Sequence, residues 1–256
     1  MHGELALSTA VLLGFLVTLA RVAGVFVFVP IPGLRSGFEL ARVVLSVSIT
    51  VALFPYWPQV NVGLSAGLLA VWMASEAALG IGIGLAVAFA VEAINVAAQV
   101  MGLQAGYAYA QTIDPATQAD SGVLVVFAQL AAGLIFFATG MDRDVLRVFA
   151  GSLISVPAGT FAISRGAAEP LLAAAGVMFS TGVRLALPVV AVLVMVDVSL
   201  ALLGRINAQL QLLSVAFPIK MLLALTIFGW ILLLLPGIMR HTMGATFSAA
   251  RGLLSP

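Results

Sequence analysis

The sequence predicts an all-α membrane protein built from long and broken helical hairpins. Hydrophobic residues make up 62% of the chain, charged residues make up 8%, and the mean hydropathy is +1.20. A soluble domain carries about 25% charged residues, so this chain has too few charges to cover a surface that faces water. The apolar residues come in long runs rather than in alternation, which indicates membrane helices and not a β-barrel.

Composition also limits the function. The net charge is +1 with no basic patch, so we expect no nucleic-acid partner. Cysteine is absent, and the two histidines, His2 and His241, stand near the ends of the chain, so we expect no disulfide and no metal site. No nucleophile elbow, Walker loop or His-Glu-x-x-His motif occurs, and we therefore expect no enzyme and no cofactor.

The first apolar run predicts a helix over Leu5–Val29, which is long enough to span a bilayer core of about 30 Å. Met1–Ser8 lacks a basic region and a cleavage site, so we expect this helix to be retained. Pro30-Ile31-Pro32-Gly33 should end it. The next apolar run, Val43–Phe54, is marginal for a full span.

Leu64–Ala98 is almost unbroken and would be roughly 50 Å long as a helix, so it should project beyond the hydrocarbon or bend. Gly80, Gly82 and Gly84 offer a bend point. Gly80 and Gly84 also share one face, which permits close approach of another helix. A narrow polar stripe at helical spacing follows, made of Glu92, Asn95 and Gln99.

In the second half of the chain, Val123–Thr139 predicts a helix and Met141–Val156 a short amphipathic helix. Pro157–Pro170 is expected to connect it to Leu171–Leu203, a run too long for a simple span that Pro188 should kink.

Phe217-Pro218 is expected to break the chain before a last helix over Ile219–Met239. Arg240, His241 and Arg251 then read as a basic tail. The basic residues between the helices do not settle the orientation in the membrane. If the N-terminus is outside, Arg35 and Arg42 fall inside, as the positive-inside rule prefers, but alternating spans then place Arg143, Arg147 and Arg165 outside.

The stretch Gly102–Pro115 differs from its apolar surroundings, with small residues, two tyrosines, glutamines and no basic residue. One interpretation is an ordinary connecting loop in water. The other is non-helical backbone that lines or closes a passage with protein walls, because irregular backbone at membrane depth survives only there.

Five charges interrupt the apolar runs: Arg21, Glu76, Glu92, Arg184 and Asp197. Each would cost about 2.5–3.5 kcal/mol at the centre of a lipid-facing helix, so they should face protein or water. Three interpretations stay open, namely ion pairs between helices, an ion or proton relay, and contacts to other subunits. Glu76 and Glu92 differ by about 160° around one helix, which favours neighbours on both sides.

Several short motifs, in order, resemble one known family. They are Leu19-Ala20-Arg21-Val22-Ala23, Pro30-Ile31-Pro32-Gly33, Arg42-Val43-Val44-Leu45-Ser46, Glu76 to Leu85, Gly102-Leu103-Gln104-Ala105-Gly106 with Asp114-Pro115, Leu185-Ala186-Leu187-Pro188 and Phe217-Pro218-Ile219-Lys220. Together they make the chain similar, from about Leu5 to Pro236, to the FliR family of the flagellar type III secretion export gate.

The resemblance implies a FliP-like part over 1–165 and a FliQ-like hairpin with a basic tail over 166–256, in one membrane domain. It implies assembly with FliP-like and FliQ-like subunits, with an FlhB-like protein associated, into a channel for unfolded flagellar proteins. The expected location is the bacterial inner membrane, as a multi-pass protein of the flagellar basal body.

Carried over by position, the family's plug loop falls on about Gly106 to Gly122. The candidate residues of this pore plug are Gly106, Tyr107, Tyr109, Gln111, Asp114, Pro115 and Gly122. The five intramembrane charges, Arg21, Glu76, Glu92, Arg184 and Asp197, are then expected to serve subunit packing. The alternatives are a solitary small-solute or ion transporter that uses the intramembrane Glu, Asp and Arg residues, a homologue from the injectisome branch, and a scaffold with no passage.

Overall fold

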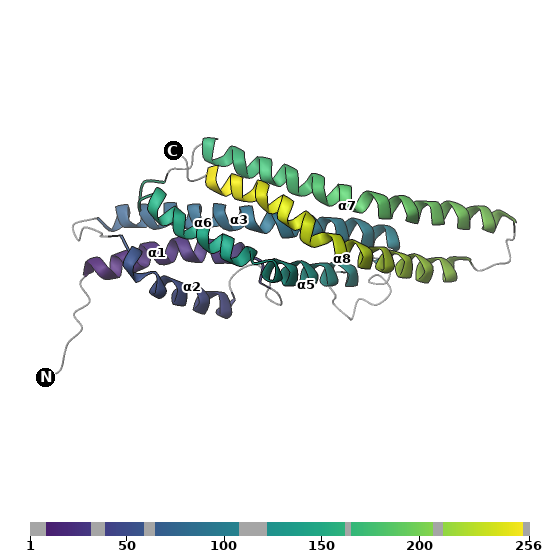
Figure 1. The fold of residues 1–256 in the computed structure, drawn as a ribbon, viewed down its shortest axis with the longest axis horizontal. Helices are drawn as coiled ribbons and strands as arrows, with labels where there is room; N and C mark the ends of the chain where they lie inside the picture. Colours follow the sequence, from purple (N-terminus) through teal and green to yellow (C-terminus); the bar gives the residue numbers. More distant parts are fainter. Residues whose placement is uncertain are drawn as a thin grey trace. The chain divides into compact units, whose positions relative to one another are not determined.

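A computed structural model describes residues 9–31, 39–58, 65–107, 122–161, 165–206 and 212–252. Every regular element within these ranges is a helix, which confirms the predicted fold class. The helices are α1 (Thr9–Phe28), α2 (Leu40–Ala52), the short 3₁₀ helix η1 (Phe54–Tyr56), α3 (Ala66–Ala105), α5 (Val123–Ala138), α6 (Met141–Ser155), α7 (Arg165–Ile206) and α8 (Leu212–Gly252) (Figure 1).

Four of the described helices are long and apolar enough to cross a membrane: Thr9–Phe28, Ala66–Ala105, Ala168–Ile206 and Ala216–Gly252. A fifth candidate is the pair α5 and α6, which meets the same test as a span bent by 69°. The bend falls at Gly140, which has a φ of 74°, a left-handed conformation that favours glycine. The predicted separate helices on either side of this position are confirmed.

Several predicted helix ends were wrong, some of them because a proline was expected to end the helix. α8 runs without a break through Pro218 and Pro236, and Arg240, His241 and Arg251 are part of it rather than of a tail. The expected connector is shorter, because α7 begins at Arg165 and continues through Pro170 and Pro188. A proline removes only one backbone hydrogen bond, and an apolar medium favours the helix over exposed backbone groups.

The start of the distinctive stretch was also misjudged. Gly102, Leu103, Gln104 and Ala105 form the last turn of α3, and the helix ends only at Gly106. Gly102 is compatible with the helix interior because a lone glycine costs only about 1 kcal/mol relative to alanine.

The chain divides into two compact units that share the three longest helices. The first comprises Met1–Phe89, Gly140–Ala175 and Gly244–Pro256, and the second comprises Ala90–Thr139 and Gly176–Met243. Each unit is described by itself below.

The first unit is organised by the close approach of α1 and α3. A Cβ atom added at Gly80 would lie 2.2 Å from the carbonyl oxygen of Arg21, and one at Gly84 would lie 2.5 Å from that of Val25. Gly24 of α1 is equally confined, with the Ala77 carbonyl oxygen at 2.6 Å from such an atom. The predicted close approach at Gly80 and Gly84 is confirmed, because no larger side chain fits between the two backbones.

Helix α2 is fastened to the end of α1 by one buried arginine. The Arg42 guanidinium donates hydrogen bonds to the carbonyl oxygens of Phe26 and, at 2.9 Å, Val29. Phe26 lies in the last turn of α1 and Val29 directly follows the helix, so the guanidinium acts as a C-terminal cap.

The second unit packs the C-terminal half of α3 against α5, α7 and α8. Its buried side chains include Ile94, Met101, Leu124, Phe136, Leu193, Phe228 and Leu235. A Cβ atom added at Gly182 of α7 would lie 2.7 Å from the Ala93 carbonyl oxygen, so α3 and α7 touch there.

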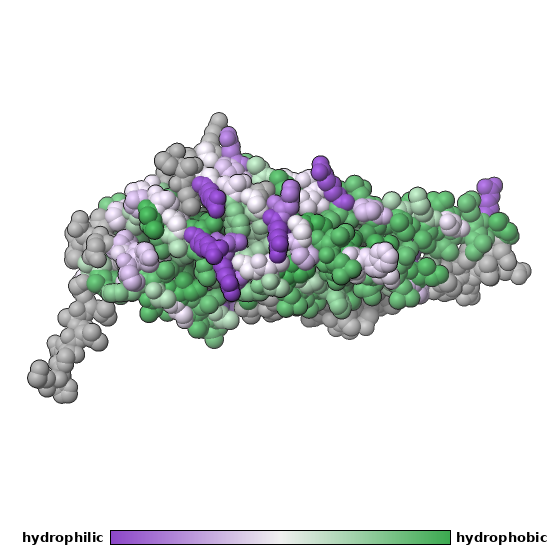
Figure 2. Space-filling model, viewed as in Figure 1, coloured by the Kyte–Doolittle hydropathy of each residue, from purple (hydrophilic) through white to green (hydrophobic). Residues whose placement is uncertain are grey.

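Much of the apolar surface of the second unit is uncovered. In α7 and in α8, only 17% of the 18-residue apolar stretch that could span a membrane is buried. Trp230, Leu233 and Leu234 of α8 are 65–82% exposed. Hydrophobic side chains dominate the visible face of these helices (Figure 2). Such a surface requires lipid or other protein as its neighbour.

We predict that Gly80→Ala destabilises the protein while Gly67→Ala does not. Both glycines lie in α3, but a Cβ atom at Gly67 meets nothing within 4 Å, whereas one at Gly80 overlaps the Arg21 carbonyl. Overpacking of this kind costs about 1–3 kcal/mol, against a gain of up to about 1 kcal/mol from helix propensity. The thermal unfolding midpoint of the detergent-purified chain measures the difference, and equal midpoints for both variants would contradict it.

Candidate functional site

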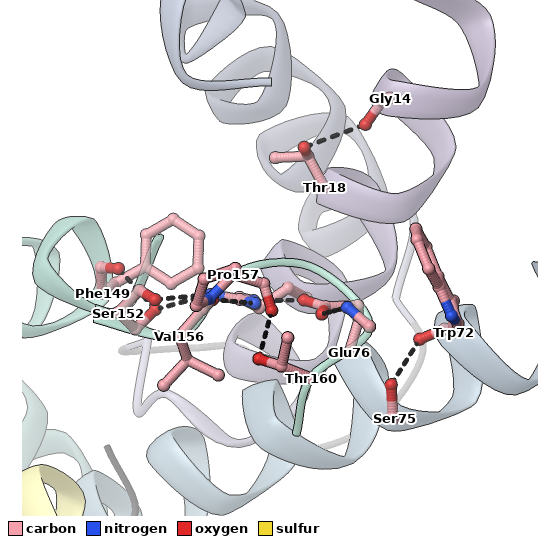
Figure 3. A network of polar contacts seen from close by, with 12 residues as sticks. Gly14, Thr18, Trp72, Ser75, Glu76, Phe149, Ser152, Val156, Pro157 and Thr160 are labelled. Atoms are coloured by element: carbon pink, nitrogen blue, oxygen red, sulfur yellow. Dashed lines mark hydrogen bonds and ion pairs between the residues drawn. The ribbon is translucent and has the colours of Figure 1, made fainter. Parts of the chain in front are cut away.

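A buried ion pair lies at the centre of the first unit. Arg21 of α1 and Glu76 of α3 are each 1% exposed, and Arg21 Nε donates a hydrogen bond to Glu76 Oε2 (Figure 3). Two of the five predicted charges are therefore paired with each other. A charge of either sign left alone here would be strongly destabilising, because the pair is removed from water.

The other polar atoms of Arg21 and Glu76 form hydrogen bonds with the last turn of α6 and with the residues that follow it. Arg21 Nη1 donates to the Ser152 carbonyl oxygen at 2.7 Å, and Arg21 Nη2 donates to the Val156 carbonyl oxygen at 2.9 Å. The Gly159 amide donates to Glu76 Oε1 at 3.0 Å. The network thus ties α1, α3, the end of α6 and the chain that follows it, and it satisfies both carboxylate oxygens.

Gly159 is held in place by its backbone conformation as well as by this hydrogen bond. Its φ is 77°, and a Cβ atom there would lie 2.4 Å from Cε2 of Trp72. A cleft of about 220 Å³ opens beside the ion pair, between Thr18, Tyr56 and Pro157. Because Arg21 and Glu76 neutralise each other, this arrangement favours a structural role over acid–base chemistry.

A second polar cluster lies in the second unit, at the end of α3. Asp197 of α7 accepts a hydrogen bond from Gln104 Nε2 at 3.1 Å and pairs with Lys220 Nζ at 2.8 Å. Lys220 is 8% exposed, so its ammonium depends on Asp197 for its counter-charge. This cluster joins the last turn of α3 to α7 and α8.

The chain turns out of α3 at Gly106, the first of the predicted plug residues. Gly106 has a φ of 88°, and a Cβ atom there would lie 2.7 Å from Cδ1 of Phe217. The next residue, Tyr107, donates its hydroxyl hydrogen to the Met221 carbonyl oxygen at 2.9 Å. Burial raises the pKa of the Tyr107 phenol above its ordinary value, in the direction that favours the protonated donor.

The two ends of the predicted plug meet at one place. A Cβ atom at Gly122, the residue before α5, would lie 3.9 Å from Cβ of Tyr107. The chain therefore leaves and returns at the same point of the second unit. The other candidate plug residues, Tyr109, Gln111, Asp114 and Pro115, lie outside the described residues.

Glu92 of α3 and Arg184 of α7 are exposed, and the described residues give neither of them a salt bridge. Asn95, in the same polar stripe as Glu92, is only 3% exposed, and its Oδ1 has no hydrogen-bond partner. The structure thus does not bring Glu92, Arg184 and Asp197 together, although all three lie in the second unit.

Sequence reasoning missed the residues that complete these two clusters, chiefly Ser152 and Lys220, and it also missed the role of Arg42 as a cap of α1. Lys220 stood in a motif that was singled out, but its partner Asp197 is 23 positions away. Ser152 is 131 positions from Arg21, and no local pattern links them. Among the described residues, no group of three or more His, Asp or Glu side chains could hold a metal ion.

Comparisons with known proteins give a consistent family match. A model of the bacterial export proteins, family 1, matches residues 12–246. The chain is 28% identical over 236 residues to the flagellar biosynthetic protein FliR of Pectobacterium carotovorum subsp. carotovorum, which covers 92% of this chain and 90% of that protein. It is 26% identical to FliR of Escherichia coli (strain K12), covering 93% and 91%. Identity to FliR of Bacillus subtilis (strain 168) is 24%, covering 94% of each.

We predict that removing one member of the buried pair is worse than removing both. Arg21→Leu or Glu76→Leu leaves an uncompensated buried charge and should cost about 3–5 kcal/mol, whereas the double variant should cost less. The exposed pair of Arg147 and Asp144 serves as the control, since breaking it should cost about 0–1 kcal/mol. Unfolding of each variant in detergent gives the four free energies, and strictly additive single costs would refute the coupling.

Proposed function

The chain belongs to family 1 of the bacterial export proteins, and we propose that it is a subunit of the flagellar type III protein export gate. The observation that carries this proposal is the match of residues 12–246, nearly the whole chain, to the family. The relatives that align with almost all of the chain are named as flagellar biosynthetic proteins. In this role the chain forms, with FliP-like and FliQ-like subunits, a channel for unfolded flagellar proteins.

The lengths of the helices support an assembly rather than a solitary bundle. α3, α7 and α8 have 40, 42 and 41 residues. Helices of this length extend about 60 Å, twice the hydrocarbon core of about 30 Å. The apolar parts beyond the core need protein neighbours, and FliP-like, FliQ-like and FlhB-like subunits of the inner-membrane basal body would supply them.

The two-part organisation remains part of the proposal. Residues 1–165 would form the FliP-like part and residues 166–256 the FliQ-like hairpin. Helices α7 and α8 of that hairpin are joined by the ion pair between Asp197 and Lys220. The proposal gives the chain no catalytic role, so energy for export comes from elsewhere in the apparatus.

The segment from Gly106 to Gly122 is proposed as the plug of the channel. Its support is geometric, because both of its ends are fixed at one point, where Tyr107 contacts α8 and lies beside Gly122. A segment that leaves and returns at a fixed point can occupy or clear a passage without moving α3 or α5.

Of the five interrupting charges, the exposed Glu92 and Arg184 are proposed to serve subunit packing, whereas Arg21 and Glu76 are buried and paired within the chain. Glu92 and Arg184 have no salt bridge among the described residues, so charges on neighbouring subunits would neutralise them. A solitary ion transporter is disfavoured, because Glu76 and Asp197 are already held by Arg21 and Lys220. The flagellar names of the relatives favour the flagellar branch over the injectisome branch.

We predict that deleting the gene from its source bacterium abolishes flagella and the secretion of flagellar proteins into the medium. A plasmid copy should restore both. Electron microscopy and immunoblots of the medium are the measurements. Normal filaments in the deletion strain would overturn the proposed function.

We also predict that replacing residues 108–121 with a short Gly-Ser linker raises the ion conductance of the assembled complex in a planar bilayer. The adjacent positions of Tyr107 and Gly122 allow a linker of two or three residues without strain on α3 or α5. A Gly-Ser replacement of the original length is the control and should leak less. Wild-type conductance of the shortened variant, in a complex of normal composition, would refute the plug assignment.

A further inference from the structure

Helix α7 carries a continuous exposed face along its second-unit part. This face, the α7 seam, consists of Ser180, Arg184, Leu187, Ala191, Met195 and Val198. Its three large apolar side chains are more than half exposed, with Leu187 at 56%, Met195 at 69% and Val198 at 54%. The residues recur at intervals of three and four, so they form one stripe along the helix.

The opposite face of α7 is the one that packs within the chain. Ala186, Val189 and Leu193 are 0–1% exposed, and Gly182 contacts α3. At 100° per residue, this buried face lies about 180° from Arg184. The seam is therefore a second and separate side of the helix, and folding of the chain does not depend on it.

Arg184 makes the seam unsuitable for lipid alone. An arginine at the centre of a lipid-facing helix is costly and is found facing protein or water. Water is no better as a neighbour, because the other long side chains of the seam are apolar. Moreover α7 is about twice as long as the hydrocarbon core, so one lipid layer cannot cover all of its apolar length.

We propose that the α7 seam binds a helix of a neighbouring membrane subunit, which carries a carboxylate opposite Arg184 and apolar residues at matching spacing. A single charged position within an apolar seam fixes the register of two helices, and the small side chains of Ser180 and Ala191 let them approach. The inference rests on the proposed function in that the export gate supplies the neighbour.

A second copy of this chain does not complement the seam. The seam contains one arginine and no acidic residue, so two copies meeting through it would bring together faces of like charge. The occupant is therefore not a second seam, and its defining feature is an Asp or Glu residue at the level of Arg184.

Photocross-linking in the assembled complex tests the occupant. A benzoylphenylalanine at Ala191 should cross-link to a partner peptide with an Asp or Glu residue about two helical turns from the cross-linked position, because Ala191 lies about two turns from Arg184 along α7. The control places it at Phe179, which is 60% exposed and about 140° from Arg184, and should not yield that peptide. Cross-links from Ala191 only to lipid, or only to a second copy, would overturn the proposal.

Charge exchange tests the ion pair. Arg184→Glu should reduce the partner that co-purifies with the tagged chain by about tenfold or more, and Arg184→Lys should retain most of it. Reversing the partner's carboxylate to Arg should restore binding to Arg184→Glu. Arg205→Leu, at the end of α7, is the control and should bind as wild type. Undiminished co-purification of Arg184→Glu, or no rescue by the exchange, would contradict the inference.

Two further readouts separate the possible failures. The isolated Arg184→Glu chain should unfold at the wild-type temperature, because Arg184 is exposed and has no salt bridge among the described residues, and a lower temperature would contradict the seam. If the wild-type chain co-purifies with export subunits but Ala191 finds only lipid, the seam is wrong and the proposed function stands. If it co-purifies with none of them, the proposed function fails.

Discussion

The buried guanidinium of Arg21 is the contact on which the first unit depends. Its hydrogen bonds join α1 to Glu76 of α3 and to two backbone carbonyls at the end of α6. Such a pair is stable away from water only when every polar atom finds a partner, and here Gly159 supplies the last one. The geometry in turn requires α1 and α3 to touch, which Gly80 allows. One ion pair and one glycine-lined contact therefore set the positions of three helices.

The second unit differs from the first in how its charges are placed, because one ion pair lies between its helices while two other charged side chains are exposed. Asp197 neutralises Lys220 inside, while Glu92 and Arg184 face outward without a salt bridge among the described residues. Together with the exposed apolar faces of α7 and α8, this distribution fits the proposed role as a subunit of a larger membrane assembly, in which neighbours would supply the missing contacts.

The base of the proposed plug combines an ion pair between helices with a turn that depends on glycine. Asp197 and Lys220 hold the last turn of α3 in place, and Gly106 then directs the chain away through a conformation that other residues rarely adopt. Tyr107 and Gly122 bring the two ends of the segment together. The rigid parts are thus the ends of the helices, and a change in the segment between them need not disturb the core of the unit.

Composition and periodicity by themselves determined the membrane class and the approximate positions of the described helices, because these properties are local, while the order of several short motifs carried the resemblance to an export family. The same local reasoning overestimated proline as a helix breaker at Pro218, where the apolar surroundings maintain α8. Sequence also identified Arg21, Glu76 and Arg184 as costly charges, but it did not say which would pair. Only the tertiary structure decided that Glu76 meets Arg21, 55 positions away, and that Arg184 is left outside. Such choices depend on which helix faces touch, and contacts between distant segments leave no periodic trace in the chain.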